Sequence, residues 1–371
     1  MTKRLALIGN QAFSMLNFRG ALISALVSRG VEVFALAPNY TDDDRRQMIA
    51  LGATPVNYRM QRNGINPIED SLTLLSLVSA LRQIEADTVL SYAIKPVIYG
   101  TLAAAAAFVP HRFAMIEGLG HVFLNKPGMK GLALKAIALK LYRAALNKAQ
   151  QAFFLNEDDK RDFLDLGLID ASRATLIGAI GIDLEQWKPA PSVLNPVTFL
   201  FVGRLLREKG IIEFIDAARE VKNRHPSARF VVLGDVDTNP SSIKPGQVAA
   251  WVAEGLLDWP GHVDVAPWLA KASVFVLPSY REGVPRSTQE AMAMGRPIIT
   301  TDAPGCRETV VEGENGFMVP ARDSAATAQA MLRYIENPRL IPMHGSASRM
   351  MAEAKFDVHR RNATLIELIG Y

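Results

Sequence analysis

Two basic side chains in the second half of the chain follow an apolar run, where they could hold an anion. The run from Val197 to Val202 leads into Gly203-Arg204, and Lys209-Gly210 follows. In open parallel sheets, ligands bind at the carboxyl ends of strands. Two unit charges about 4 Å apart interact by roughly 4 kcal/mol at an effective dielectric near 20, so Arg204 and Lys209 could grip a diphosphate and stabilise it as it departs. On position alone, the alternative is an ordinary surface Arg and Lys after a strand.

Two carboxylates follow the next strong strand candidate, Val274 to Leu277. The turn from Pro278 to Arg286 leads from it into a helix that carries Glu290. A proline near the first turn starts such a helix, and its free N–H groups favour an anion. Glu282 lies in the turn, so both carboxylates are expected to border one pocket, into which the amides of Gly283 and Val284 point. Each glutamate taken alone could equally be a solvated carboxylate.

The elements that must position these residues alternate as in a parallel α/β fold. Short apolar runs typical of buried parallel strands are separated by helical patterns in both halves of the chain. A proline-rich stretch over 187–196 predicts a linker. We therefore expect one doubly wound domain over 1–187, a second over 197–350, and a C-terminal helix over 351–371 that crosses back to the first. The expected strands are 5–8, 31–36, 88–90, 152–155, 197–202, 230–233, 274–277 and 297–300, and the expected helices include 18–29, 210–221 and 287–294.

The composition indicates two folded domains, and the cysteine content indicates a cytoplasmic location. The 371 residues are 49 % hydrophobic and 21 % charged, which excludes a disordered chain. The single cysteine, Cys306, cannot form an internal disulfide and fits a reducing, cytoplasmic environment. No secretion signal is visible, and the longest mainly apolar stretch, Val97 to Val109, is shorter than the ~20 residues that cross a bilayer. A net charge of +4 suggests an anionic partner.

Basic residues gather in one segment of the first half. No acidic residue lies between Glu117 and Glu157, and on a helix over 128–148 the side chains of Lys130, Lys140 and Lys148 fall on one stripe. Basic amphipathic helices bind anionic membrane surfaces or lipid diphosphates, although a charged stripe is usually a solvated face. Nucleic acid is not expected as a partner, because aromatic residues do not interleave with these charges.

The second half resembles the retaining glycosyltransferases of family 4, which have the GT-B architecture of two Rossmann-like domains facing a central cleft. The resemblance rests on Phe201–Arg204, Lys209-Gly210, Leu277–Pro285 and Gln289–Pro297, and extends to Gly305–Glu308 and Asn315–Phe317. It implies that Arg204 and Lys209 bind the donor diphosphate, with Gly203, Gly283 and Val284 beside it. It also implies that Glu282 contacts hydroxyls of the transferred sugar and that Glu290 contacts the ribose.

The first half is similar to bacterial transferases that extend sugars on undecaprenyl diphosphate. The similarity lies in Phe18–Gly20, Ala35–Pro38 and Gly118–Gly120, and Met115–His121 looks like the loop where many relatives place a histidine. His121 is then a candidate catalytic residue, and an ordinary loop histidine is the alternative. Arg19, Lys130, Lys140 and Lys148 become candidates for the acceptor or its lipid diphosphate. The paired glycines common in the family's first loop are absent, since only Gly9 follows the first strand.

The resemblance implies an enzyme that moves a hexose or N-acetylhexosamine from a UDP-sugar, with retention, to a polyprenyl-diphosphate-linked saccharide in surface glycan assembly. Such a protein would be cytoplasmic and peripheral at the inner face of the cell membrane. The alternatives are a GT-B-shaped sugar-nucleotide epimerase and a transferase with a soluble acceptor. The first strand ends without Gly-x-Gly-x-x-Gly, which argues against a dinucleotide enzyme. Asp235-Val236-Asp237 matches a metal-binding Asp-x-Asp but follows a strand and Gly234, so we interpret it as loop and expect no required metal.

Overall fold

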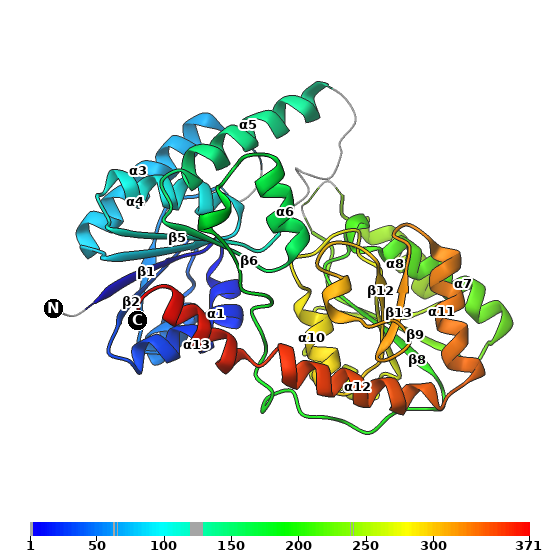
Figure 1. Ribbon diagram of the computed structural model, residues 1–371. Coiled ribbons are helices and arrows are strands. Elements are labelled where there is room, and N and C mark those ends of the chain that lie inside the picture. Colours follow the sequence, from blue (N-terminus) through cyan, green and yellow to red (C-terminus); the bar gives the residue numbers. More distant parts are fainter. Residues whose placement is uncertain (1–2, 62–63, 65, 119–128, 238, 240) are drawn as a thin grey trace. The chain divides into compact units, whose positions relative to one another are not determined.

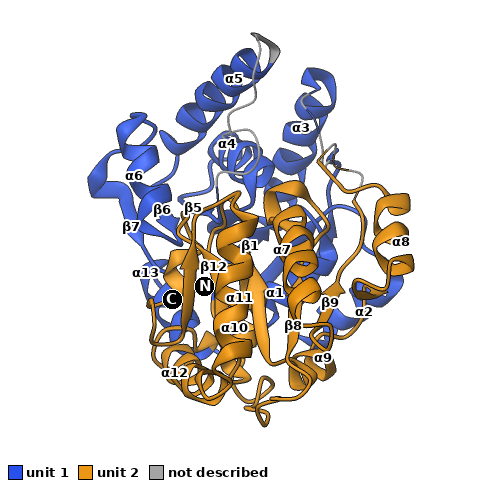
Figure 2. Ribbon diagram, turned by 90° about the vertical axis from the view of Figure 1, so that its right-hand side faces the viewer, with its two compact units in different colours: residues 1–180, 359–371 blue, residues 181–358 orange. Residues whose placement is uncertain are grey.

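The computed structural model describes residues 3–61, 64, 66–118, 129–237, 239 and 241–371, and the side chains of 129 and 130 are not described. The chain divides into two compact units (Figures 1 and 2). Unit 1 comprises Met1–Ile180 and His359–Tyr371, and unit 2 comprises Gly181–Val358. The division falls before the proline-rich stretch that the sequence marks as a linker.

Unit 1 is built on a seven-stranded sheet in the order β3-β2-β1-β4-β5-β6-β7, and all neighbouring strands are parallel. The strands are β1 (Arg4–Ile8), β2 (Glu32–Ala37), β3 (Thr54–Asn57), β4 (Thr88–Tyr92), β5 (His111–Ile116), β6 (Gln151–Phe154) and β7 (Ala174–Leu176). The helices are α1 (Ala12–Val27), α2 (Asp42–Ala50), α3 (Pro67–Ile84), η1 (Pro96–Gly100), α4 (Thr101–Ala106), α5 (Met129–Leu146), α6 (Glu157–Asp165) and η2 (Ala171–Arg173).

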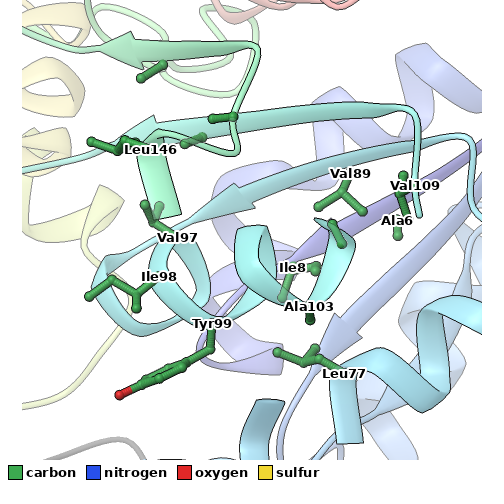
Figure 3. Close-up of a cluster of buried hydrophobic side chains, with 14 of the residues drawn as sticks. Ala6, Ile8, Leu77, Val89, Val97, Ile98, Tyr99, Ala103, Val109 and Leu146 are labelled. Atoms are coloured by element: carbon green, nitrogen blue, oxygen red, sulfur yellow. The ribbon is translucent and has the colours of Figure 1, made fainter. Parts of the chain in front are cut away.

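Alternate side chains of β1 pack into two separate hydrophobic cores, one on each face of the sheet. Leu5 and Leu7 pack into the cluster that contains the buried side chains of α1, whereas Ala6 and Ile8 pack into the cluster with α3, η1 and α4. Figure 3 shows the second cluster, which includes Ile8, Val97 and Leu77. Because successive side chains of a strand point to opposite faces, helices cover both faces of this sheet, as in a doubly wound fold.

The α1 helix begins at Ala12, not at Phe18 as the apolar pattern predicts. Polar residues hide its first turns from a pattern search, yet they are satisfied inside the helix. The Ser14 hydroxyl donates to the carbonyl of Gln11, and the Asn17 amide donates to the carbonyl of Phe13. Arg19 therefore lies in the middle of α1 and not at its start.

The last residues of the chain fold with unit 1. The predicted helix over 351–371 is two helices, since α12 (Leu340–Lys355) ends before Phe356 and α13 (Val358–Leu368) begins after it. Leu365, Ile366 and Ile369 are buried in the same core as α1. The chain thus starts and ends in unit 1.

Unit 2 is built on a six-stranded sheet in the order β10-β9-β8-β11-β12-β13, again parallel throughout. The strands are β8 (Thr198–Val202), β9 (Arg229–Leu233), β10 (Asp258–Gly261), β11 (Val274–Leu277), β12 (Ile298–Thr301) and β13 (Gly316–Val319). Besides α12, the helices are η3 (Arg207–Lys209), α7 (Ile211–Arg224), α8 (Pro245–Ala253), α9 (Ala266–Lys271), α10 (Arg286–Ala293), η4 (Arg307–Thr309) and α11 (Ser324–Glu336).

A buried arginine attaches the proline-rich stretch to unit 2. The Arg296 guanidinium is fully buried and donates to the carbonyls of Ala190 at 2.6 Å, Pro191 at 2.9 Å and Ala272 at 3.0 Å. Burial lowers the pKa of Arg296 to about 10. Because these bonds fix 190–191 against unit 2, the stretch belongs to that unit. The predicted fold class, two doubly wound α/β domains, is confirmed.

Candidate functional site

The carboxyl end of β8 presents Arg204 beside the loop that follows β9. The Arg204 side chain is half exposed, and its Nη1 lies 3.0 Å from Oδ2 of Asp237. The other carboxylate oxygen of Asp237 accepts from the amide of Asn239 at 2.9 Å. The second aspartate of the Asp-x-Asp sequence therefore organises its own loop and holds Arg204.

Lys209 and Glu282, predicted from separate motifs, form one ion pair. Lys209 Nζ lies 2.5 Å from Oε1 and 2.7 Å from Oε2 of Glu282. Gly210 makes this approach feasible, since it has φ of 74° and a Cβ there would lie 2.0 Å from the carbonyl oxygen of Pro278. The loop after β8 and the loop after β11 are thus in direct backbone contact.

The loop that carries Glu282 is held from two sides. On one side, the amide of Tyr280 donates to the carbonyl of Glu208 at 2.9 Å. On the other, the amide of Glu282 donates to the carbonyl of Pro304 at 2.9 Å, and a Cβ at Gly305 would lie 2.1 Å from the Glu282 carbonyl oxygen. Glu282 therefore sits on a fixed backbone, as a residue that must orient a ligand requires.

Helix α10 begins next to the end of β8. Its N-cap, Pro285, provides no side-chain cap, and the Ser287 hydroxyl donates to the carbonyl of Val202 at 3.1 Å. This contact places the first turn of α10 beside the carboxyl end of β8, where Gly203 and Arg204 follow. Gly283 is half-buried and Val284 is buried just before that turn.

Glu290 is buried on α10 and pairs with Arg286 one turn earlier. Arg286 Nε donates to Oε1 of Glu290 at 2.8 Å. Burial raises the pKa of Glu290, and the Arg286 guanidinium opposes that rise. Sequence reasoning did not assign Arg286 a role, although the four-residue spacing between a cation and a carboxylate on a helix was a usable signal.

A second polar contact behind the Glu282 loop was not predicted. The Tyr280 hydroxyl donates to Oε1 of Glu213 at 2.6 Å, and the Arg322 guanidinium lies 4.7 Å from the centre of the Tyr280 ring. Burial and this hydrogen bond raise the pKa of Tyr280. No sequence motif links these residues, because they come from β11's loop, α7 and the segment after β13.

In unit 1, the Tyr92 side chain at the end of β4 lies against the backbone of Gly9, which follows β1. A Cβ at Gly9 would lie 2.3 Å from the Tyr92 hydroxyl oxygen, and the Tyr58 hydroxyl donates to the Gly9 carbonyl at 2.7 Å. Gly9 is therefore more than a turn residue, since any larger residue there would require the buried Tyr92 side chain to shift. No sequence motif pointed to Tyr92 or Tyr58.

Arg19, a predicted acceptor-binding residue, is buried. Only 3 % of its side chain is exposed, and its guanidinium pairs with Glu117 and lies 4.7 Å from the centre of the Tyr92 ring. Arg19 is thus committed to partners within unit 1 and does not present itself to solvent.

Two of the other predicted residues of unit 1, Lys130 and Lys140, belong to α5, and Lys148 follows it. Lys140 is exposed on that helix, and Lys148 is exposed in the turn after the helix ends. Lys130 belongs to the first turn of α5, but its side chain lies outside the described part, and His121 lies outside the described residues altogether.

Within the described ranges, no three histidine, cysteine, aspartate or glutamate side chains gather as metal ligands would. Across the same residues, no helix combines the length and apolar character needed to cross a bilayer.

Family and structure comparisons agree with the geometry of unit 2. Residues 196–337 match the family model described as glycosyl transferases group 1. The chain carries a group 1 glycosyltransferase domain. The match begins two residues before β8 and includes every candidate site residue of unit 2 named above.

Two relatives share much of their length with this glycosyltransferase. The N,N'-diacetylbacillosaminyl-diphospho-undecaprenol alpha-1,3-N-acetylgalactosaminyltransferase of Campylobacter jejuni is 28 % identical over 352 residues, 91 % of this chain and 90 % of the relative. The UDP-Gal:alpha-D-GlcNAc-diphosphoundecaprenol alpha-1,3-galactosyltransferase of Escherichia coli is 27 % identical over 286 residues, 74 % of this chain and 72 % of the relative.

Solved structures show the same fold at low identity. Sucrose-phosphate synthase from Thermosynechococcus elongatus matches with a TM-score of 0.81 at 18 % identity, covering 99 % of this chain and 98 % of that one. Anabaena HepE, solved in complex with UDP-glucose, matches with a TM-score of 0.78 at 18 % identity, covering 100 % and 99 %. The protein therefore has the GT-B glycosyltransferase fold, as the resemblance implied.

Proposed function

We propose that this glycosyltransferase moves a hexose or N-acetylhexosamine from a UDP-sugar, with retention of anomeric configuration, to a polyprenyl-diphosphate-linked saccharide in surface glycan assembly. Unit 2 binds the donor and unit 1 binds the acceptor. The observation that carries the proposal is the Lys209–Glu282 pair at the carboxyl ends of β8 and β11, beside the uncapped start of α10. It brings a cation for the diphosphate and a carboxylate for sugar hydroxyls to one place.

The charges of unit 2 suit departure of a nucleoside diphosphate. When the bond between the anomeric carbon and the diphosphate oxygen breaks, negative charge develops on the diphosphate and positive charge on the sugar ring. Arg204, Lys209 and the amides at the start of α10 stabilise the diphosphate. Glu282 then accepts hydrogen bonds from the transferred sugar, and Glu290 from the ribose.

Retention follows from substitution on the face that the diphosphate leaves. The acceptor hydroxyl oxygen bonds to the anomeric carbon while its proton passes to the departing diphosphate oxygen. Glu282 is engaged by Lys209 and is assigned to hydroxyl binding, so the pair of carboxylates does not take the nucleophile and acid roles of glycosidases. His121 is proposed as a further group near the anomeric carbon.

The donor is proposed to be a UDP-sugar that binds without a required metal. The Escherichia coli relative is named for UDP-Gal, and HepE was solved with UDP-glucose. Asp237, which an Asp-x-Asp metal site would use, is held by Arg204 and by the amide of Asn239. Turnover that a chelator abolishes and manganese restores would contradict the metal-free part.

The acceptor is proposed to be lipid-linked, which places the enzyme at the cytoplasmic face of the cell membrane as a peripheral protein. Both relatives named above act on diphosphoundecaprenol-linked sugars. The α5 region supports membrane contact, because Lys140 and Lys148 are exposed together with Leu132 and Ile137. Exposed cationic and apolar side chains on a helix and the turn that follows it fit an anionic bilayer surface. Lys130 is proposed to join them.

The donor and acceptor are tested by product analysis. The acceptor is N,N'-diacetylbacillosaminyl-diphospho-undecaprenol, which appears in the name of the Campylobacter relative. A panel of UDP- and GDP-sugars is tested with this acceptor, and UDP-N-acetylgalactosamine is the first donor tried. Transfer from a UDP-sugar with an α-linkage in the product supports the proposal. An epimerised nucleotide sugar formed without acceptor would show the epimerase alternative, and no binding of any UDP-sugar would refute the donor assignment.

The membrane contact is tested on α5. Lys140→Glu with Lys148→Glu should reduce turnover on acceptor in anionic liposomes and leave turnover in detergent unchanged, since only the first requires docking. Lys222→Glu with Lys271→Glu, in unit 2, serves as a control of equal charge change. Unchanged turnover on liposomes in the α5 variant would refute the contact.

A further inference from the structure

Arg19 is a buried charge in the middle of a helix, which demands partners. Only 3 % of its side chain is exposed, and a buried guanidinium is costly unless its donors are satisfied. Its Nη2 donates to Oε1 of Glu117 and lies 3.1 Å from the sulfur of Met115. Its plane lies 4.7 Å from the centre of the Tyr92 ring, a cation–π contact. Arg19 is thus held by β4, β5 and the residue that follows β5.

Glu117 differs from Arg19 in reaching the surface. It follows β5 directly, and 26 % of its side chain is exposed. Strand β5 pairs with β4, and β4 pairs with β1, so Glu117 shares the carboxyl edge of the sheet with Tyr92 and Gly9. In open parallel sheets this edge is where ligands bind. Arg19 therefore fixes the Glu117 carboxylate at the sheet edge of unit 1 where substrate is expected.

We propose that Glu117 contacts substrate by accepting a hydrogen bond from the attacking hydroxyl of the acceptor, and that Arg19 is its positioning residue. This inference rests on the proposed function. It replaces the expectation that Arg19 itself binds the acceptor or its lipid diphosphate, because the Arg19 guanidinium is buried and engaged by Glu117 and Tyr92. The hydroxyl proton still passes to the departing diphosphate, so Glu117 orients the nucleophile and keeps its charge.

A structural role would instead make the pair a clamp between α1 and β5. The two roles differ in their pH dependence. Burial raises the pKa of Glu117, and Arg19 opposes that rise. Of the other groups around the pair, Tyr92 packs on Arg19, and Tyr40 and Tyr58 lie beyond Tyr92. Removing Arg19 should raise the pKa of Glu117 further. When the pH is lowered, Glu117 would then become protonated at a higher pH than in the wild type.

The test compares Glu117→Gln, Arg19→Met and Arg19→Lys with the wild type. Transfer from UDP-N-acetylgalactosamine to N,N'-diacetylbacillosaminyl-diphospho-undecaprenol is followed from pH 5.5 to 9, with UDP affinity and melting temperature alongside. Glu117→Gln should lower kcat about 10- to 100-fold, the loss expected for a hydrogen bond to a charged group, and remove the acid limb. Arg19→Met should move the acid limb to higher pH, and Arg19→Lys should move it back toward wild type.

The controls separate this inference from the proposed function. Arg29→Met removes an exposed arginine just after α1 and should change neither rate nor pH profile. All variants should keep wild-type UDP affinity, because the donor residues lie in unit 2. Full kcat in Glu117→Gln, or an Arg19→Met loss that is equal at every pH and tracks the melting temperature, would overturn the inference. Absence of UDP binding by the wild type would instead count against the proposed function.

Discussion

At the scale of single residues, the proposed function assigns diphosphate binding and sugar recognition to the two members of one ion pair, Lys209 and Glu282. The ammonium bonds both oxygens of the carboxylate, so the pair is preformed before a donor arrives. A hydroxyl bound to a charged group contributes roughly 1.5–3 kcal/mol. Glu282→Ala should therefore lower transfer about 10- to 100-fold, measured as initial rate at saturating donor.

The same substitution should spare the fold. Lys209 keeps 22 % of its side chain exposed, so water can solvate the ammonium once the carboxylate is gone. The melting temperature is the control, and Glu282→Gln, which keeps the side-chain volume, should lie between wild type and Glu282→Ala in rate. A near-normal rate in Glu282→Ala would remove Glu282 from the site.

Cys306 gives a second prediction at this scale. Its thiol is fully buried beneath the Glu282 loop, and burial raises its pKa to about 12, so it stays protonated at pH 8. Because the thiolate is the reactive form, a thiol reagent at pH 8 should label no cysteine in the native protein and one per chain after denaturation. Rapid labelling of native protein would show that the loop around Ser279 and Cys306 opens.

The sequence pointed to the residues of the candidate site in unit 2 but not to their partners. Arg204, Lys209, Glu282 and Glu290 stood in recognisable spacings after strands, so their positions could be inferred. Their partners Asp237 and Arg286 could not be ranked above other charged residues, because a side-chain pairing between loops leaves no pattern in one sequence. The burial of Arg19 could not be predicted, because the apolar pattern placed the start of its helix at Phe18, six residues after the true start.

At the scale of elements, Gly210 connects η3 to α7 and sets the distance between two loops. The left-handed backbone at φ of 74° alone costs a residue with a Cβ roughly 1–2 kcal/mol. The new Cβ would also lie 2.0 Å from the Pro278 carbonyl oxygen, which cannot move without shifting the Glu282 loop. Gly210→Ala should lower both the melting temperature and the UDP affinity.

Gly246 is the matched control for this change. It lies in the first turn of α8, and nothing is within 4 Å of a Cβ built on it. Gly246→Ala should be neutral or stabilise by roughly 0.4–1 kcal/mol through the unfolded state. Wild-type UDP affinity in Gly210→Ala would show that the two loops are not coupled as the structure implies.

The elements could be predicted where burial is complete and not where it is partial. Strands β1, β8 and β11 are continuous apolar runs, and their predicted bounds match within a residue. Edge strands β3 and β10 were missed, since Thr54–Asn57 and Asp258–Gly261 each contain a proline and exposed polar residues. Strand β5 was missed because it begins with His111 and Arg112, which lie outside the core.

At the scale of the whole molecule, each unit has its own sheet and the chain enters unit 1 twice. The last segment, His359–Tyr371, completes the core that β1, β2 and α1 begin. Nothing local in 351–371 required this, because an amphipathic helix can pack on either unit. The stability of unit 1 should therefore depend on residues more than 300 positions away in sequence from β1.

Ile366 is the residue through which this dependence can be measured. It is fully buried on α13 in the core with Leu5, Leu7 and Leu22, and truncating a buried isoleucine to alanine costs roughly 2–5 kcal/mol. In Ile366→Ala, hydrogen exchange followed by mass spectrometry should accelerate in peptides from β1, β2 and α1, while β8 and β11 keep wild-type protection and UDP affinity stays unchanged. Glu367→Ala, one position on and exposed, should leave exchange in both units unaltered. Equal acceleration in β8 and β11 would mean that the two units unfold as one cooperative body, whereas unchanged exchange in β1 would mean that α13 contributes nothing to the core it joins.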